Sequence, residues 1–214
     1  MSNMFEYFFS QYRNYHQVDI ILEITGAIFG LLSVWFAKKD NILVFPTGLV
    51  STFIYAYLLW QWELLGDSMI NVYYFVMSIY GWYHWTRKKG NQVEFPIAVM
   101  NNKEKGIAVV LFTATIIFVV LVYFYFNKFT NLYSYIDTFL TAIFFVGMWL
   151  MAKRKIENWI FWIIGDIISI PLYFAKGFTF TSLQYLIFTI VAIYGYSEWK
   201  KILNNSTIQE TQKF

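Results

Sequence analysis

Three side chains at four-residue spacing form the best candidate for a ligand site in this chain. Asn158, Trp162 and Asp166 stand at i, i+4 and i+8, so a helix would carry all three on one face. An amide can hydrogen-bond a ligand, an indole face attracts flat cations, and a carboxylate pairs with positive charge. Ser169 and Tyr173 extend the same face. The set predicts recognition of a small molecule.

Asp166 is unusual because apolar residues surround it on both sides in the sequence. An unpaired carboxylate near the centre of a bilayer is costly, so it should face a polar cavity or a partner. The alternative is a structural role, in which a protonated Asp166 hydrogen-bonds a neighbouring helix. We favour a functional role, because ionisable residues inside membranes usually serve function. Gly165 and Pro171 flank the acid and predict a bend in its helix.

Other polar side chains inside apolar segments are further candidates for substrate contacts. They are Thr47, Ser51 and Tyr55 in a second i, i+4, i+8 set, then Asn71 and Tyr74, and finally Gln184 and Tyr185. We expect the first set to oppose the face of Asp166 across the binding site. The alternative for the hydroxyls is bonding to their own backbone, and for the amides bonding between helices.

The segments that carry these residues are long and apolar. The chain is 58% hydrophobic and only 14% charged, which suits a polytopic membrane protein and not a soluble domain. Aromatic residues reach 23%, as lipid-facing rings and interfacial belts or as the lining of a cavity for a flat ligand. Seven apolar segments predict an all-α membrane protein with seven transmembrane helices, near residues 20–37, 42–62, 69–85, 107–126, 135–152, 159–175 and 180–199.

Basic residues predict the orientation of these helices. On the seven-helix interpretation, 13 of the 16 Lys and Arg residues fall on one side of the membrane. The positive-inside rule then places the N-terminus outside and the C-terminus in the cytoplasm. Residues 1–19 are expected to form an interfacial segment, residues 89–130 a cytoplasmic loop with a fourth, linking helix, and residues 202–214 a cytoplasmic tail.

The two groups of apolar segments, in residues 20–88 and 131–201, form an internal repeat at an offset of 114 positions. The sequence I-Y-G-W from Ile79 returns as I-Y-G-Y from Ile193, while Glu23 aligns with Asp137 and Trp35 with Trp149. We expect residues 20–88 and 131–201 to be parallel three-helix repeats, in the 3+1+3 arrangement of SWEET proteins. Around the candidate site a three-residue shift aligns Phe45 with Trp162 and Gly48 with Gly165, which puts Leu49 in the place of Asp166.

Several kinds of function lack their sequence signature. No phosphate-binding G-x-x-x-x-G-K-[ST] motif occurs, the two histidines stand apart, and the chain has no cysteine. The seventh segment also lacks the lysine that a retinal Schiff base needs. We therefore expect no metal, no cofactor, no catalytic group and no nucleic-acid partner. A seven-helix receptor or a membrane enzyme is the alternative class, but receptors lack such a parallel repeat, and an enzyme would need a reactive group of residues that the sequence does not show.

Two segments resemble the PnuC family of vitamin transporters. The stretch E-N-W-I-F-W-I-I-G-D-I-I-S from Glu157 is similar to that family's sixth-helix signature. G-D-S-M-I-N-V-Y-Y from Gly66, followed by S-I-Y-G-W from Ser78, resembles its third helix. The resemblance covers residues 20–201.

The resemblance implies uptake of nicotinamide riboside by facilitated diffusion across the cell inner membrane, with a cytoplasmic kinase that traps the substrate by phosphorylation. Relatives that carry thiamine or riboflavin are the alternatives. Asn158 and Trp162 match the family's substrate-binding positions, whereas Asp166 stands where an amide is expected. Nicotinamide riboside and thiamine are both flat cations, so the acid favours either of them over neutral riboflavin. The oligomeric state is left open, with a homo-oligomer as one arrangement.

Overall fold

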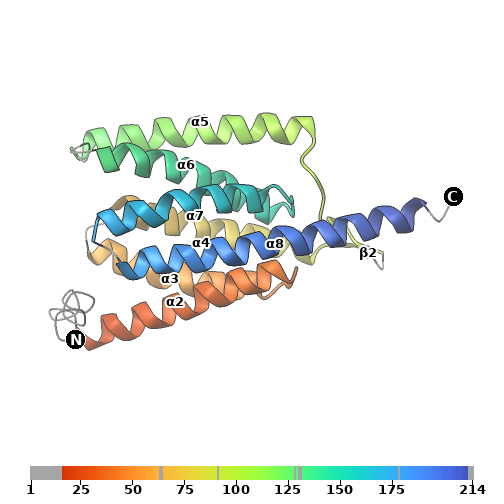
Figure 1. Cartoon of the computed structure of the whole chain (residues 1–214), viewed down its shortest axis with the longest axis horizontal. Coiled ribbons are helices and arrows are strands. Elements are labelled where there is room, and N and C mark those ends of the chain that lie inside the picture. Colours follow the sequence, from red (N-terminus) through yellow and green to blue (C-terminus); the bar gives the residue numbers. More distant parts are fainter. Residues whose placement is uncertain are drawn as a thin grey trace.

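A computed structural model describes residues 16–62, 65–90, 92–127, 129, 132–177 and 179–211, and in these residues the chain is almost entirely helical (Figure 1). The expected interfacial segment lies largely outside this part. The described residues form seven helices: α2 (Gln17–Lys38), α3 (Val44–Gln61), α4 (Leu65–Thr86), α5 (Asn102–Tyr125), α6 (Leu132–Ala152), α7 (Asn158–Ala175) and α8 (Thr179–Thr211). A short antiparallel ribbon, β1 (Lys88–Lys89) and β2 (Gln92–Val93), precedes α5.

Each apolar segment of the sequence corresponds to one of these helices. By length and composition, α2, α5, α6 and α7 are able to span a membrane. The other three carry more Tyr, Trp or polar residues, so seven crossings stay a prediction. α5 begins earlier than expected, because Asn101 and Glu104 form a reciprocal capping box at its start. α8 runs on through most of the expected tail, where neither Gly nor Pro interrupts it.

The helices pack as two groups of three. α3 packs against α2 and α4 in the first half, and α7 packs against α6 and α8 in the second half. The halves meet where α4 lies against α6 and where α2 lies against α8. α5 packs on α6 at the edge of the bundle (Figure 1).

One end of the bundle holds most of the basic loops, and we call it the basic end. It carries Lys38 and Lys39 at the end of α2, the ribbon after α4, and the turn from Lys153 to Glu157 after α6. The loop before α5 is fixed to that turn, because the Ala98 amide donates to the Arg154 carbonyl at 3.1 Å and the Ile156 amide donates to the Ala98 carbonyl at 3.0 Å. The loop that leads into α5 is therefore attached to the second half of the bundle.

The turns after α2 and α6 have the same backbone geometry, 114 residues apart. Asp40 and Arg154 both adopt positive φ, 50° and 54°. In both turns the next residue donates its N–H to a carbonyl five residues back, at 3.0 Å and 2.9 Å. The three-residue shift proposed for this region is therefore wrong, and Phe45 corresponds to Trp159 rather than to Trp162.

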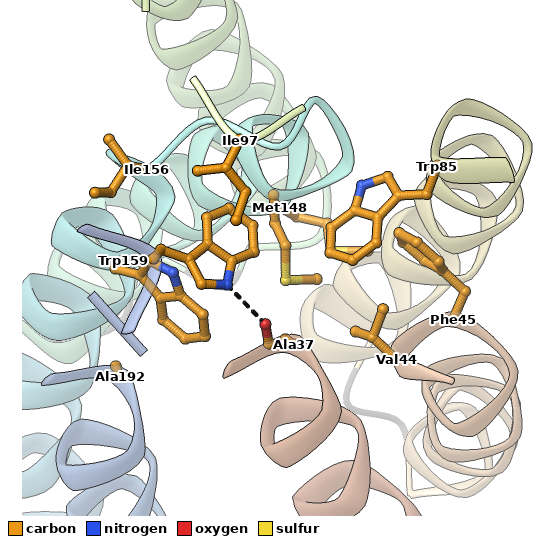
Figure 2. Close-up of a cluster of buried hydrophobic side chains, with 11 residues drawn as sticks. Ala37, Val44, Phe45, Trp85, Ile97, Met148, Ile156, Trp159 and Ala192 are labelled. Atoms are coloured by element: carbon orange, nitrogen blue, oxygen red, sulfur yellow. Dashed lines mark hydrogen bonds between the residues drawn. The ribbon is translucent and has the colours of Figure 1, made fainter. Parts of the chain in front are cut away.

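Each I-Y-G motif has a packing role. A Cβ on Gly195 would lie 2.6 Å from the ring of Trp159, and a Cβ on Gly81 would overlap the ring of Phe45. Both rings are fully buried in the core cluster near the basic end (Figure 2). The glycines therefore let α4 approach α3, and α8 approach α7, at equivalent places.

Gly195→Ala should destabilise the protein by about 1–3 kcal/mol, because Trp159 has no room to move away from an added methyl group. Gly106→Ala is the matched control. That glycine is also helical, no atom would contact its Cβ within 4 Å, and the change should be neutral or slightly stabilising. Thermal unfolding of the two detergent-purified variants measures the difference. Equal melting temperatures would contradict the assigned role of Gly195.

Candidate functional site

The face of α7 that the sequence singled out is turned into the bundle. Asn158 and Ser169 are completely buried, and Asp166 is 3% exposed. Trp162 and Tyr173 are partly buried between neighbouring helices. The four-residue spacing therefore describes an interior face, while its contact with a ligand stays a prediction.

Asp166 is buried without a hydrogen bond from any residue that the structure describes. Its carboxyl group lies close enough to the phenols of Tyr74 and Tyr185 to interact with them electrostatically. A buried polar group without a partner is costly, and the cost grows if the group is charged. This arrangement would allow the Asp166 carboxyl group to bind a cationic or hydrogen-bonding ligand.

Aromatic rings from four helices surround this acid. The Trp162 ring lies 5.9 Å from that of Tyr74 on α4 and 5.6 Å from that of Phe144 on α6, between centroids. The series continues from Phe144 to Tyr185 on α8 at 6.1 Å, and from Tyr185 to Tyr173 at 5.1 Å. A flat ligand needs about 7 Å between two rings that sandwich it, twice the usual carbon contact distance. The rings must therefore separate when such a ligand enters.

Phe144 is a part of this site that the sequence analysis missed. Its ring occupies the space where a side chain at position 165 would be, so Gly165 is what admits it beside Asp166. The signal in the sequence was Gly165 itself, which we interpreted as a bend and which in the structure admits the ring of Phe144. Tyr185 was noted as a polar group in the last helix, and the structure places it in the same aromatic series.

The expected opposing face on α3 does not lie against α7 in this structure. The Ser51 hydroxyl donates to the Gly26 carbonyl on α2 at 2.8 Å, and the Tyr55 ring lies beside Gly26. The Thr47 hydroxyl donates to the Leu43 carbonyl at 2.6 Å, within its own helix. These residues serve the packing of the first half, and their contact with a ligand stays a prediction.

The amides of the other candidates differ in their surroundings. The Asn71 side chain donates to the Asp67 carbonyl at 2.9 Å, one turn back on α4. The Asn158 amide donates to the Lys155 carbonyl at 2.6 Å, which leaves its own oxygen buried without a partner among the described residues. Gln184 is half-buried on α8. Of these three, Asn158 lies on the same helical face as Asp166.

Charged groups near the opposite end of the bundle pair with each other. Lys176, after α7, donates to both carboxylate oxygens of Asp137 on α6, at 2.6 Å and 2.8 Å. Asp67, near the start of α4, lies close enough to interact electrostatically with both. This cluster lies beyond Tyr173 and does not include Asp166.

Long apolar helices around a buried polar face are typical of a multi-pass membrane protein. A family model described as nicotinamide mononucleotide transporter matches residues 20–201, so the chain belongs to that family. It is a transporter and not an enzyme, and its place is the cell inner membrane.

Individual relatives agree with this assignment. The chain is 24% identical to the nicotinamide riboside transporter PnuC of Escherichia coli (strain K12), over 83% of this chain and 84% of the relative. It is also 24% identical to the riboflavin/roseoflavin transporter RibM of Streptomyces davaonensis, over 83% of each chain. A crystal structure of the vitamin B3 transporter PnuC superposes with a TM-score of 0.66, at 23% identity over 88% of this chain and 84% of that one. The fold is thus that of a solved transporter.

Proposed function

We propose that this protein carries nicotinamide riboside into the cell by facilitated diffusion. The observation that carries the proposal is the buried Asp166 beside the aromatic faces of Trp162 and Tyr74. Nicotinamide riboside carries a flat pyridinium ring, which gains from both cation–π attraction and a nearby carboxylate. The printed function of the Escherichia coli relative supports the same substrate.

The same chemistry separates the proposed substrate from two of three other candidates. Thiamine is also a flat cation, so it is the second candidate for this site. Riboflavin, the substrate in the name of the Streptomyces relative, is neutral and would not offset the cost of burying a carboxylate. The mononucleotide in the family's description carries a phosphate, which Asp166 would repel.

We further infer that the two halves are parallel repeats that move against each other. Support comes from equivalent turns at Asp40 and Arg154 and from two equivalent bonds at the other end. The Ser68 hydroxyl donates to the Ala56 carbonyl, and the Ser182 hydroxyl donates to the Ile170 carbonyl, again 114 residues apart. The N-terminus would be outside and the basic end in the cytoplasm. Rocking of one half against the other would expose the site to each side in turn.

Substrate trapping, rather than energy coupling, would drive net uptake. The chain has no P-loop, and Asp166 is the one acid on the inward face of α7. Phosphorylation by a cytoplasmic kinase would add charge to the substrate and prevent its return through a site that already holds a carboxylate.

Variants of the α7 face should separate the contribution of the Trp162 ring to substrate binding from the contribution of the Asp166 charge. Trp162→Ala should weaken binding by about 1–3 kcal/mol, through lost cation–π and apolar contact, and Trp162→Phe should retain part of it. Asp166→Asn should weaken binding of nicotinamide riboside more than binding of its reduced, uncharged form. Calorimetric titration with these two compounds and thiamine measures both effects.

The control for these titrations is Ile160→Ala, which changes an exposed side chain of the same helix. It should bind like the wild type. If Trp162→Ala also bound all three compounds like the wild type, the α7 face would be packing and the substrate would bind elsewhere.

Purified protein in liposomes should bring nicotinamide riboside to equal concentrations inside and outside, without ATP or an ion gradient. Enclosing a nicotinamide riboside kinase with ATP should raise the total label inside while free substrate stays level. Labelled substrate with and without an uncoupler measures this. Accumulation of free substrate that an uncoupler abolishes would contradict facilitated diffusion.

A reporter that is active only in the cytoplasm should be active when fused after Phe214. The same reporter fused after Asn127 should be inactive, because that loop lies at the end opposite to the basic loops. The 13 basic residues on one side are the physical reason. The reverse pattern of activity would refute the proposed orientation.

A further inference from the structure

Two indoles tie the halves together at the basic end in a reciprocal way. Trp85 on α4 donates its Nε1–H to the Ala152 carbonyl on α6, at 3.2 Å. Trp199 on α8 donates its Nε1–H to the Ala37 carbonyl on α2, at 2.9 Å (Figure 2). Both indoles are buried, and their ring centroids are 5.9 Å apart. Each half therefore supplies one donor and one acceptor.

An ion pair links the two equivalent turns at the same level. Arg154 of the second half lies 3.0 Å from Asp40 of the first, between Nη2 and Oδ1, and Arg154 is 7% exposed. The guanidinium also lies 4.3 Å from the ring centroid of Trp85 and donates to the Phe95 carbonyl at 3.1 Å. Burial raises the pKa of Asp40 and lowers that of Arg154, while the charge of each opposes the shift of the other.

We call the two indole bonds, the Asp40–Arg154 ion pair and the rings packed on them the closing layer. The closing layer lies between the candidate site and the basic end. Trp159 packs edge-on against Trp199, with centroids 5.5 Å apart, and both are essentially unexposed. Trp162 and Tyr74, the aromatic residues beside Asp166, pack directly against this cluster. A molecule bound at Asp166 could reach the basic end only after the cluster has separated.

The layer is also incompletely hydrogen-bonded, which makes it able to open. Five buried side-chain atoms here lack a hydrogen-bond partner among the described residues: His84 Nδ1, Arg154 Nε, Glu157 Oε2, Asn158 Oδ1 and Trp159 Nε1. Buried polar groups of this kind carry the cost of lost hydration. Opening would admit water to them and so offset the cost of breaking the links between the halves.

We propose that the Asp40–Arg154 ion pair and the two indole bonds form the gate on the basic side, closed in this structure, which separates to release substrate. The inference rests on the proposed transport by rocking of the two halves. The links join the first half to the second half, so movement of one half against the other must break them. The gate would be a feature of both turns, since each contributes one charge.

The absence of native cysteine allows a direct test by thiol labelling. Ser169→Cys places a nearly isosteric thiol on the buried face of α7, behind the proposed gate. A membrane-impermeant maleimide added from the basic side should label this protein slowly. Asp40→Asn in the same background removes the charge, and Asn tolerates the positive φ of that turn. It should speed labelling by about tenfold, which is a shift of ~1.4 kcal/mol in the opening equilibrium.

Two further variants support the interpretation. Trp85→Phe removes one indole donor, keeps a ring in the cluster and should also speed labelling. Exchanging the charges, with Asp40→Arg and Arg154→Asp together, should slow labelling again relative to Asp40→Asn, because the two turns have equivalent backbones. Each variant is compared only if it elutes as a single species in size exclusion.

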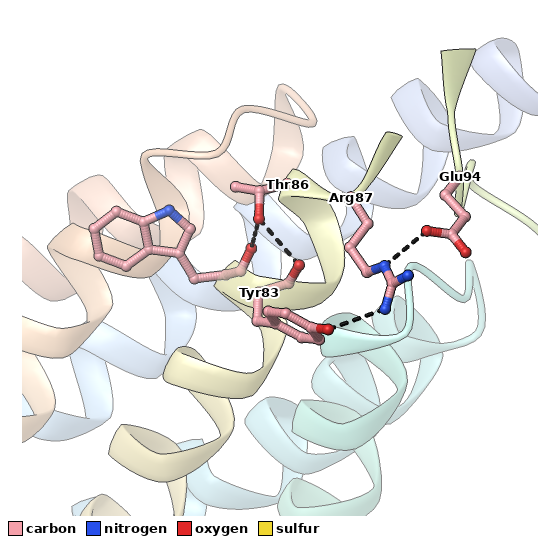
Figure 3. A network of polar contacts seen from close by, with 5 residues as sticks. Tyr83, Thr86, Arg87 and Glu94 are labelled. Carbon is pink, nitrogen blue, oxygen red and sulfur yellow. Dashed lines mark hydrogen bonds and ion pairs between the residues drawn. The ribbon is translucent and has the colours of Figure 1, made fainter. Parts of the chain in front are cut away.

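The matched control is Arg87→Gln. Arg87 makes an ion pair with Glu94 at 2.8 Å and bonds to Tyr83, on the same basic side, but it does not join the two halves (Figure 3). Its loss should leave labelling slow. Unchanged labelling of folded Asp40→Asn and Trp85→Phe, or faster labelling from the opposite side only, would refute the gate. Because labelling needs no substrate, faster labelling without vitamin transport would support the gate and refute the proposed function.

Discussion

Close approach of helices is the constraint on which the rest of this structure depends. Inside a bilayer the lipid tails are as apolar as the side chains, so helices gain little by excluding solvent and associate through packing contacts. Here aromatic rings lie against glycines: Phe45 on Gly81, Trp159 on Gly195 and Phe144 on Gly165. Many small dispersion contacts add up over such ring faces. The first two contacts hold each half together, and the third builds the surroundings of Asp166.

The same packing makes the buried acid effective. Rings that exclude water lower the local dielectric, which strengthens the attraction of a carboxylate for a cation and raises the cost of leaving it unpaired. Asp166, which accepts no hydrogen bond from the residues that the structure describes, therefore costs stability while it has no partner. A neutral residue would pack at lower cost but would not distinguish a cation from a neutral ring. On the proposed function, this position would exchange stability for selectivity.

The sequence predicted the helices and the shared, buried face of α7, because both follow from local periodicity. The apolar segments gave all seven helices, and the four-residue spacing gave the buried face of α7. The start of α5 was missed because its capping box lies in a polar loop, outside any apolar segment.

What periodicity could not predict is which helix a face meets. Ser51 and Tyr55 share a face of α3, but only the arrangement of the bundle turns that face toward α2. Phe144 carried no signal among 23 phenylalanines. The shifted alignment failed because it matched residue types, Gly48 with Gly165, whereas equivalence is set by packing role. In those terms Gly81 and Gly195 are the true pair.

If substrate binds beside Asp166 as proposed, the aromatic series would connect its binding to movement of the halves. Tyr74 belongs to the first half and Trp162 to the second, so their contact crosses the interface at the level of Asp166. A flat ligand that inserts between rings now 5–6 Å apart must separate them. Ring–ligand contacts then replace ring–ring contacts, so the net gain from stacking is small, and the charge of Asp166 has to favour the occupied state. Since Trp162 and Tyr74 also pack on the cluster of Trp85, Trp159 and Trp199, their displacement would disturb the layer that joins the halves at the basic end. On the proposed function, occupancy of the site and opening of the gate would be linked through side chains in direct contact.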